Sequence, residues 1–287
     1  MTAKTLKSLH RAQRDDIGDL VTRRPVPAPG LEQVDPFLFL NHHGPQTYGQ
    51  NNAGLPFGPH PHRGFETVTF ILEGELAHRD SAGHESIIRA GGVQWMTAGS
   101  GLIHAEVSPE GFLKSGGRLE LLQLWVNLPS HLKMSPPRYV GLQGDQIPAI
   151  RVDRGRATVN LISGNWSGHV GPIPSMTGVF MTTISLKPDG KAGFGSLGGR
   201  NVFLYVVSGE VRVSGSTIPA WNLARFDLEG DMIEIEGRKG SVVLFGHGAP
   251  LAEPVFAHGP FVMNTRQEIV DAIRDYNGGL FDNVSAA

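Results

Sequence analysis

An apolar run, a Gly-Glu turn and a second apolar run make up the stretch VTFILEGEL at residues 68–76. The same arrangement recurs in FLYVVSGEV at residues 203–211, and we call the distance from position 68 to position 203 the repeat length. Each stretch is typical of two strands joined by a turn, because β-branched and aromatic residues suit a pleated surface and glycine suits the turn. A repeat length close to half the chain favours two copies of one β-domain.

Short β-type runs bounded by Gly, Pro, Asn or Asp continue along the whole chain. We expect strands at Glu66–Leu72, Val93–Thr97, Leu119–Val126, Val179–Leu186, Val202–Val207, Met232–Ile235 and Val242–Phe245. Many short strands at close spacing indicate an all-β protein built as a sandwich or barrel. One helix is predicted at the end of the chain, where Thr265 and Glu268 form a capping box, Ile269 and Ile273 share a face, and Gly278 follows as a stop.

The chain length of 287 residues also favours two domains, at about 150 residues each. We predict an N-terminal barrel over residues 1–130, a linker over residues 131–150 that contains Pro136-Pro137, and a C-terminal barrel with the final helix over residues 151–287. The 38 glycines and 20 prolines amount to about one residue in five, against an average of about one in eight, and they lack the period of collagen. They therefore indicate many turns.

Composition excludes several classes of protein. The absence of cysteine excludes disulfide scaffolds, thiolate zinc sites and cysteine nucleophiles. A net charge of −2 with 18% charged residues argues against direct nucleic-acid binding. No apolar run reaches the roughly 20 residues of a membrane span, and residues 1–24 lack the apolar core of a secretory signal. We expect a soluble, cytoplasmic protein whose N-terminal segment is a surface strand or helix, with a loose tail as the alternative.

The most informative stretch for chemistry is PHPHRGFE at residues 59–66. In an extended chain His60 and His62 point to the same side, as two ligands of one ion must, and the proline between them disfavours a helix. About forty residues later His104 and Glu106 have the same spacing. Two adjacent strands would bring three imidazoles and one carboxylate together, a set that suits Fe(II), Mn, Co, Ni, Cu or Zn and leaves positions open for substrate or O₂.

Other residues carry a plainer interpretation. An isolated pair of histidines two residues apart is more often a surface or core pair than a metal site, and the second pair is what favours the metal here. Glu66 is a further candidate ligand, or a group that hydrogen-bonds to one. Of the adjacent His42 and His43 at most one can face the metal, and surface placement is the default expectation.

These residues carry a resemblance to a known family. Gly54, His60, His62, Glu66 and Gly74 resemble the first cupin motif, and Gly91 to His104 resembles the second with two extra residues before the histidine. The strings HPHRGFETVT at 60–69 and MTAGSGLIHAE at 96–106 are similar to the pirin family in particular, as are NLP at 127–129, PPRY at 136–139 and HGPFVMNT at 258–265. The similarity runs from about residue 36 to residue 275.

The resemblance implies two tandem cupin barrels with one metal in the N-terminal barrel, which is iron in bacterial and human members. Its ligands would be His60, His62, His104 and Glu106, with Glu106 in place of Glu66, the carboxylate ligand of many other cupins. Several pirins have quercetin 2,3-dioxygenase activity, and the human protein is also known as a nuclear transcription cofactor. Family membership therefore leaves both an enzyme and a regulatory protein open.

The second copy of the repeat lacks these ligands. A shift of one repeat length carries the four candidates to Gly195, Leu197, Lys239 and Ser241, none of which is an ordinary metal ligand. His247 and His258 lie in this half without partners at ligand spacing, so hydrogen-bonded turn or interface histidines are the plainer reading. We therefore predict a metal-free second barrel.

Two functions follow as hypotheses. The first is a metal-dependent dioxygenase, most simply with Fe(II), that acts on a flavonol or another small aromatic enol with O₂ and uses Glu106 as proton acceptor. The second is a regulatory protein whose partner contacts depend on the state of the metal, without significant turnover. A structural role of the metal is a third alternative.

Overall fold

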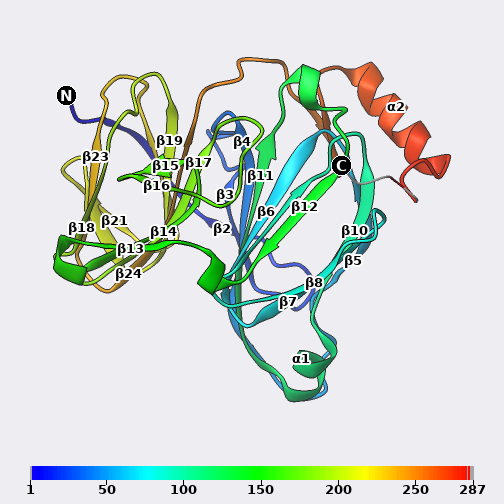
Figure 1. Cartoon of the computed structure of the whole chain (residues 1–287), viewed down its shortest axis with the longest axis horizontal. Helices are drawn as coiled ribbons and strands as arrows, with labels where there is room; N and C mark the ends of the chain where they lie inside the picture. The colour runs from blue at the N-terminus through cyan, green and yellow to red at the C-terminus, as the bar shows by residue number, and fades with distance from the viewer. Residues whose placement is uncertain (1, 283, 285–287) are drawn as a thin grey trace. The chain divides into compact units, whose positions relative to one another are not determined.

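The computed structural model describes residues 2–282 and 284, which divide into two compact units (Figure 1). We call the unit of Arg14–Thr22, Phe37–Asp145 and Leu251–Ala287 the N-terminal barrel. The unit of Met1–Gln13, Arg23–Pro36 and Gln146–Pro250 is the C-terminal barrel. The short strands β2 (Gln13–Arg14) and β3 (Thr22–Val26) lie where the chain passes from one unit to the other.

Two antiparallel sheets build the N-terminal barrel. One has the strand order β5 (Phe57–His62), β10 (Leu102–Val107), β7 (Glu75–Asp80) and β8 (Glu85–Arg89). In the other, β12 (Arg138–Leu142), β9 (Val93–Thr97), β6 (Phe65–Glu73), β11 (Gly117–Asn127) and β4 (Phe37–Tyr48) are neighbours in that order. The barrel also contains α1 (Glu110–Ser115), the 3-10 turn η1 (Ser130–Leu132), β25 (Phe256–His258), β26 (Phe261–Met263) and α2 (Arg266–Asn277), while η2 (Gly144–Gln146) ends it.

The C-terminal barrel repeats this plan. Its larger sheet has the order β1 (Leu6–Arg11), β22 (Asn222–Phe226), β19 (Asn201–Ser208), β24 (Ser241–Gly248), β17 (Phe180–Leu186), β14 (Ala157–Ser163) and β13 (Ala149–Val152). Its smaller sheet has the order β18 (Lys191–Phe194), β23 (Ile233–Gly237), β20 (Glu210–Val213) and β21 (Ser216–Pro219). The 3-10 turn η3 (Asp153–Gly155) and the hairpin of β15 (Asn165–Trp166) with β16 (His169–Val170) complete it.

The predicted repeat is confirmed by the strand orders. In the smaller sheets, the order β5-β10-β7-β8 of the N-terminal barrel corresponds to the order β18-β23-β20-β21 of the C-terminal barrel. In the larger sheets, the order β9-β6-β11-β4 corresponds to the order β22-β19-β24-β17. Every matched pair of strands is thirteen labels apart. The fold is therefore all-β, with two copies of one barrel, each closed over its own apolar core.

The helix at the end of the chain also forms as the sequence predicts. In α2, Thr265 is the N-cap and makes a reciprocal capping box with Glu268, and Gly278 is the C-cap. Ile269 is buried and Ile273 packs against the same apolar cluster, which includes Ile103 of β10. The helix thus covers part of the sheet that carries β5 and β10.

The chain ends differ from the predicted ranges 1–130 and 151–287. Strand β1 pairs with β22, so the N-terminal segment belongs to the C-terminal barrel. Residues 251–287, with α2, belong to the N-terminal barrel. Each end covers a surface that the barrel would otherwise expose: β1 pairs with the outer edge of β22, and the apolar face of α2 packs beside Ile103. The N-terminal segment contains a strand, as expected, although Met1 lies outside the described residues.

The predicted linker over residues 131–150 is partly ordered as sheet. Arg138–Leu142 form β12, which pairs with β9 in antiparallel register, Tyr139 opposite Met96. The boundary between the units does fall inside the predicted segment, between Asp145 and Gln146. The prolines Pro136-Pro137 therefore mark the start of a strand rather than a free connection.

A buried lysine fixes the turn that follows β5. Lys133 Nζ donates hydrogen bonds to the carbonyl oxygens of Gly64 (2.8 Å) and Val262 (3.0 Å) and to Asn127 Oδ1 (2.6 Å). Burial lowers the pKa of Lys133 to about 8, so the ammonium group is still charged at neutral pH. All three of its N–H groups have acceptors, which ties the turn at Gly64 to the end of β11 and to β26.

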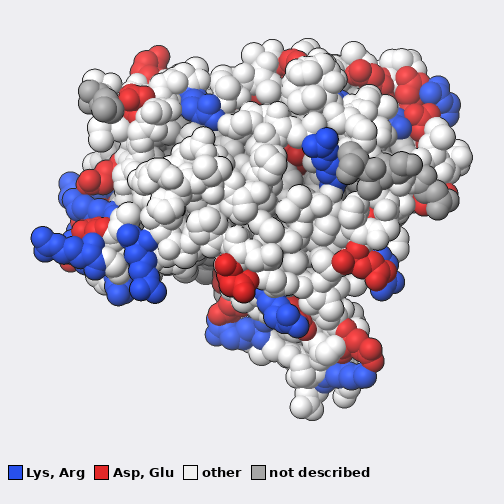
Figure 2. All heavy atoms as spheres, in the orientation of Figure 1, with Lys and Arg blue, Asp and Glu red and all other residues white. Residues whose placement is uncertain are grey.

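Charged side chains are mixed on the face shown in Figure 2. Lys and Arg gather at the left edge of this view (Figure 2). In the C-terminal barrel, ion pairs join Lys191 to Glu234 (3.0 Å), Arg238 to Glu236 (3.1 Å) and Arg156 to Asp153 (2.8 Å). Lack of direct nucleic-acid binding remains a prediction. Within the described part of the chain, neither α-helix has the length and apolar character needed to cross a membrane.

Candidate metal centre

Strands β5 and β10 bring three histidines together. The two strands are antiparallel, with His60 opposite His104 and His62 opposite Leu102. The candidate ligand nitrogens of His60, His62 and His104 all lie within 4.8 Å of one another. His62 and His104 are buried, whereas His60 is half-buried. The three imidazoles therefore converge as the spacing predicts, because alternate residues of one extended strand meet a residue of its neighbour, and metal binding by them remains a prediction.

Hydrogen bonds orient two of the three rings. Nδ1–H of His60 donates to the carbonyl of Gly58 (2.7 Å), and Nδ1–H of His62 donates to the carbonyl of Pro260 (3.2 Å). A carbonyl oxygen only accepts, so the proton of each ring resides on Nδ1 and the lone pair on Nε2. This arrangement is typical of histidines that bind a metal, which donate their other N–H to a supporting group.

Burial keeps the two inner rings neutral. Burial, with a smaller contribution from His60, lowers the pKa of His62 to about 3. Burial and the neighbouring histidines also hold the pKa of His104 well below its usual value. Because a metal binds the neutral ring, these side chains need not lose a proton at neutral pH before they coordinate.

His104 carries the clearest sign of a missing partner. Its Nδ1 and Nε2 are both buried and have no hydrogen-bond partner among the described residues. A buried polar atom without a partner costs free energy, about 1–3 kcal/mol in typical proteins. A metal at the point where the three rings meet would bind one of these nitrogens, so the donor set fits a first-row ion such as Fe(II) or Zn.

Glu106 lies on the same strand as His104 but outside the three-histidine group. Its two carboxylate oxygens accept hydrogen bonds from Thr69 Oγ1 (2.7 Å) and Gln123 Nε2 (2.5 Å). These donors come from the facing sheet, β6 and β11, and fix the buried carboxylate inside the barrel. Glu106 as fourth ligand and as proton acceptor therefore remains a prediction.

Glu66 has a different environment. Its carboxyl group accepts a hydrogen bond from Thr97 Oγ1 (2.7 Å), and burial raises its pKa to about 7. Like Glu106, it is absent from the group of converging ligand atoms. The alternative reading of Glu66 as a hydrogen-bonding group agrees with this contact.

The expected surface placement of His42 and His43 is wrong, because both are buried. His42 Nε2 lies 2.8 Å from Glu120 Oε1, and His43 Nδ1 lies 2.9 Å from Thr22 Oγ1. Strand β4 pairs along its length with β11, and around His42 and His43 its side chains on both faces are covered. Adjacent residues do face opposite ways, but neither way leads to solvent.

A second histidine cluster beside the site was missed by the sequence argument. The ring of His78 lies 5.5 Å from that of His104 and stacks on Tyr139 at 4.0 Å, while its Nε2 is 3.0 Å from Asp80 Oδ2. His78 lies on β7, directly opposite Glu106 of β10. Only the pairing of β7 with β10 reveals this neighbour, and no local motif encodes that pairing.

Aromatic rings form a wall beside His62. The ring centroids of Trp125 and Phe65 lie 5.4 and 5.0 Å from that of His62, and Phe39 packs on Trp125 at 4.7 Å. Phe39 thus belongs to the same wall. An apolar wall next to a neutral histidine suits a flat, uncharged ring system.

The turn between β5 and β6 depends on a glycine. Gly64 has φ = +89°, and a Cβ placed there would lie 2.0 Å from the carbonyl oxygen of Val262. Gly83 has the same φ but open space around it, so it is a matched control. We expect Gly83→Ala to cost about 1–2 kcal/mol and Gly64→Ala about 3 kcal/mol or more, because only the latter adds a collision with backbone.

Urea denaturation of the two alanine variants and the wild type measures this difference. Equal losses at Gly64 and Gly83 would show that φ alone matters, and that the contact with Val262 does not position the turn after His62.

Comparison with known proteins covers both barrels. The family model of pirin matches residues 19–126, and that of the pirin C-terminal cupin domain matches residues 181–282. A pirin-like protein of Caulobacter vibrioides is 40% identical over 93% of this chain and 94% of its own. Human pirin is 38% identical over 95% of this chain and 91% of its own.

A solved structure is also similar over nearly the whole chain. The crystal structure of a quercetin 2,3-dioxygenase from Acinetobacter baumannii has a TM-score of 0.92 and 33% identity, and covers 98% of this chain and 99% of its own. The prediction of two cupin barrels with a C-terminal helix is thereby confirmed.

Proposed function

Because the chain belongs to the pirin family, we propose that it is a metal-dependent dioxygenase that acts on flavonol-like substrates with O₂, of the quercetin 2,3-dioxygenase type. The observation that carries this proposal is the convergence of three histidines, of which His104 is buried and has no hydrogen-bond partner among the described residues. The likeness to the Acinetobacter baumannii quercetin dioxygenase supports the substrate class. Fe(II) is the metal we propose, and Mn, Co, Ni, Cu and Zn also suit the ligands.

The histidines and Glu106 have separate roles in this proposal. His60, His62 and His104 would hold the metal, and the metal would supply a Lewis acid for a hydroxyl of the substrate. Glu106 accepts the proton of that hydroxyl, because its carboxylate is on the strand of His104 and inside the barrel. Thr69 and Gln123 position the carboxylate through their two hydrogen bonds.

The aromatic wall binds the substrate ring. Trp125 and Phe65 contact the buried side of His62, whereas His60 is half-buried. We therefore place the entrance on the side of His60 and the planar body of the substrate against Trp125. Exclusion of water by these rings strengthens the polar interactions at the site.

Aerobic turnover of quercetin by iron-loaded protein tests the enzymatic proposal. We expect oxygen uptake that matches quercetin consumption, and loss of both in His60→Ala. The proposal fails if no oxygen is consumed, or if His60→Ala has the activity of the wild type. The same sample, assayed for metal content, shows whether the loss follows the metal.

One observation favours a second candidate function, a regulatory protein that responds to the state of the metal. His62 is hydrogen-bonded to the carbonyl of Pro260, and its neighbour Arg63 pairs with Asp275 of α2 (2.8 Å). A change at the metal would therefore reach a surface helix through two contacts. Under this function, partner capture differs between the Fe(II) and Fe(III) forms in protein that does not consume oxygen with quercetin.

A further inference from the structure

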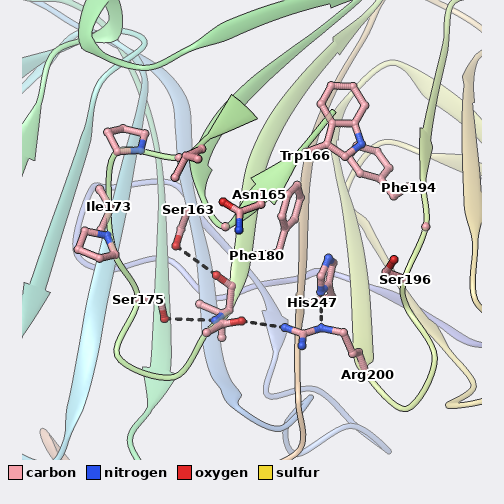
Figure 3. A pocket seen from close by; sticks show the side chains of 18 residues that line it. Ser163, Asn165, Trp166, Ile173, Ser175, Phe180, Phe194, Ser196, Arg200 and His247 are labelled. Carbon is pink, nitrogen blue, oxygen red and sulfur yellow. Dashed lines mark hydrogen bonds between the residues drawn. The ribbon is translucent and has the colours of Figure 1, made fainter. Parts of the chain in front are cut away.

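The C-terminal barrel has a cavity of about 810 Å³. It lies among β14, β17, β18 and the hairpin β15–β16, and Figure 3 shows its lining side chains. A cavity of this size is in the range of small-molecule sites, about 300–1,000 Å³. None of the metal-ligand candidates belongs to it, since all of them lie in the N-terminal barrel.

The cavity occupies the place that corresponds to the metal centre in the repeat. Thr67 of β6 faces Trp125 of β11, and one repeat length after Thr67, Val202 of β19 faces His247 of β24. His247 thus corresponds to Trp125, the ring beside His62. Phe180, which pairs with His247, likewise corresponds to Phe39, which pairs with Trp125.

The ligand positions of β5 and β10 have apolar counterparts. Ala192 of β18 pairs with Ile235 of β23. These two residues correspond to the pair of His60 and His104 in the first barrel. Phe194, two residues after Ala192, faces Ile233 as His62 faces Leu102. The strand pairing therefore identifies Ala192 and Phe194 as the counterparts of His60 and His62. The uniform shift by one repeat length had assigned Gly195 and Leu197 to these positions. The second barrel has a cavity at this place but carries no ligand side chains at these positions.

Arg200 and His247 form the polar end of the cavity. Nε–H of Arg200 donates to Nδ1 of His247 (2.7 Å), and Nη2 of Arg200 donates to the carbonyl of Gly178 (2.8 Å). The imidazole stacks on Phe180, with centroids 4.8 Å apart and planes at 4° (Figure 3). Burial and the charge of Arg200 lower the pKa of His247 to about 3, so the ring is neutral and its proton is on Nε2. This end therefore offers N–H donors and one positive charge.

The remaining walls combine apolar and aromatic side chains with the polar side chains of Ser163, Asn165, Ser175 and Ser196. Trp166 and Phe194 lie close together (Figure 3), with ring centroids 5.3 Å apart. Trp166 Nε1 donates to the carbonyl of Gly193 (3.1 Å), which ties the hairpin to β18. Ile173, Pro172 and Pro174 line the cavity as well. No Asp or Glu is among the described lining residues, so nothing in the wall neutralises Arg200.

We propose that this cavity is a second ligand site that binds a small planar aromatic carboxylate. The carboxylate accepts hydrogen bonds from the guanidinium of Arg200, and the ring lies against Phe194 and Trp166. A planar guanidinium matches a carboxylate in shape as well as charge, and aromatic walls favour a flat ring. Recognition at this site therefore depends on an arginine, where the first barrel depends on a metal.

Calorimetric titration of the full chain with 2-naphthoate tests the proposal. The protein is first stripped of metal by a chelator, so that the carboxylate cannot bind an ion at His60, His62 and His104. We expect one bound molecule per chain, and an affinity at least about tenfold weaker in Arg200→Met, because the charged hydrogen bond is lost. Arg151→Met, which removes an exposed arginine of β13, is expected to bind as the wild type does.

A comparison within the wild type keeps the test independent of variant folding. The amide 2-naphthamide has the same rings but no charge, and we expect it to bind at least about tenfold more weakly than 2-naphthoate. Equal affinities for acid and amide would overturn the proposal, as would unchanged binding in a folded Arg200→Met variant. Loss of 2-naphthoate binding in His62→Ala alone would assign the carboxylate to the first barrel and overturn it as well.

Discussion

Replacing His104 by alanine is expected to lower the affinity for a divalent first-row metal by more than about 100-fold. Loss of a group that only hydrogen-bonds to a ligand already lowers metal affinity by about 10- to 100-fold, and loss of a ligand itself should lower it further. His104 faces His60 across the strand pair and has its ring 4.9 Å from that of His62. Without it, the two histidines of β5 would hold the ion alone. Metal content after dialysis, together with titration by Co(II) or Ni(II), measures the effect.

A matched control is available in the same barrel. His131 is an exposed histidine of η1, so His131→Ala removes an imidazole without touching the cluster. It is expected to retain the metal content of the wild type. Equal metal content in His104→Ala and wild type would show that the metal, if bound at all, is held elsewhere.

A stability measurement separates loss of the ligand from loss of the fold. The two ring nitrogens of His104 are buried without partners among the described residues, which penalises the metal-free protein. In chelator-treated samples His104→Leu is therefore expected to be at least as stable as the wild type. Metal should stabilise the wild type and leave His104→Leu unchanged, since only a state that binds the ion gains from it.

The sequence was sufficient for those features that depend on spacing within one strand. His60 and His62 converge because alternate residues of an extended chain share a face, and the repeated strand-turn-strand stretches indicate two copies of one barrel. The capping box at Thr265 is a local signal in the same sense, and it started α2 where expected. In each case the determining residues lie a few positions apart.

Features that depend on pairing between distant segments could not be read in this way. Nothing in Leu6–Arg11 specifies β22 as its partner, and nothing in Arg138–Leu142 specifies β9. The burial of His42 and the approach of His78 to His104 follow from such pairings as well. Such contacts depend on the packed barrel, where the cost of closing a long loop is offset by many interactions together.

Replacing Glu106 by glutamine is expected to lower the rate of quercetin turnover by about 100- to 10,000-fold, the usual contribution of a positioned proton acceptor. The amide keeps the size of the side chain and can still accept from Thr69 Oγ1, but it cannot take up a proton at neutral pH. Steady-state oxygen uptake with quercetin, on samples of known metal content, measures the loss. Glu66→Gln is the matched control, because that carboxyl group is also buried but bonds to Thr97.

Metal content distinguishes the two roles predicted for Glu106. If it only accepts the proton, Glu106→Gln binds as much metal as the wild type and turns over slowly at every metal concentration. If it is also a ligand, metal affinity falls together with turnover, and excess metal restores part of the rate. Loss of turnover in Glu66→Gln with an active Glu106→Gln would reverse the assignment, and would make the Thr97-bonded carboxyl group the proton acceptor.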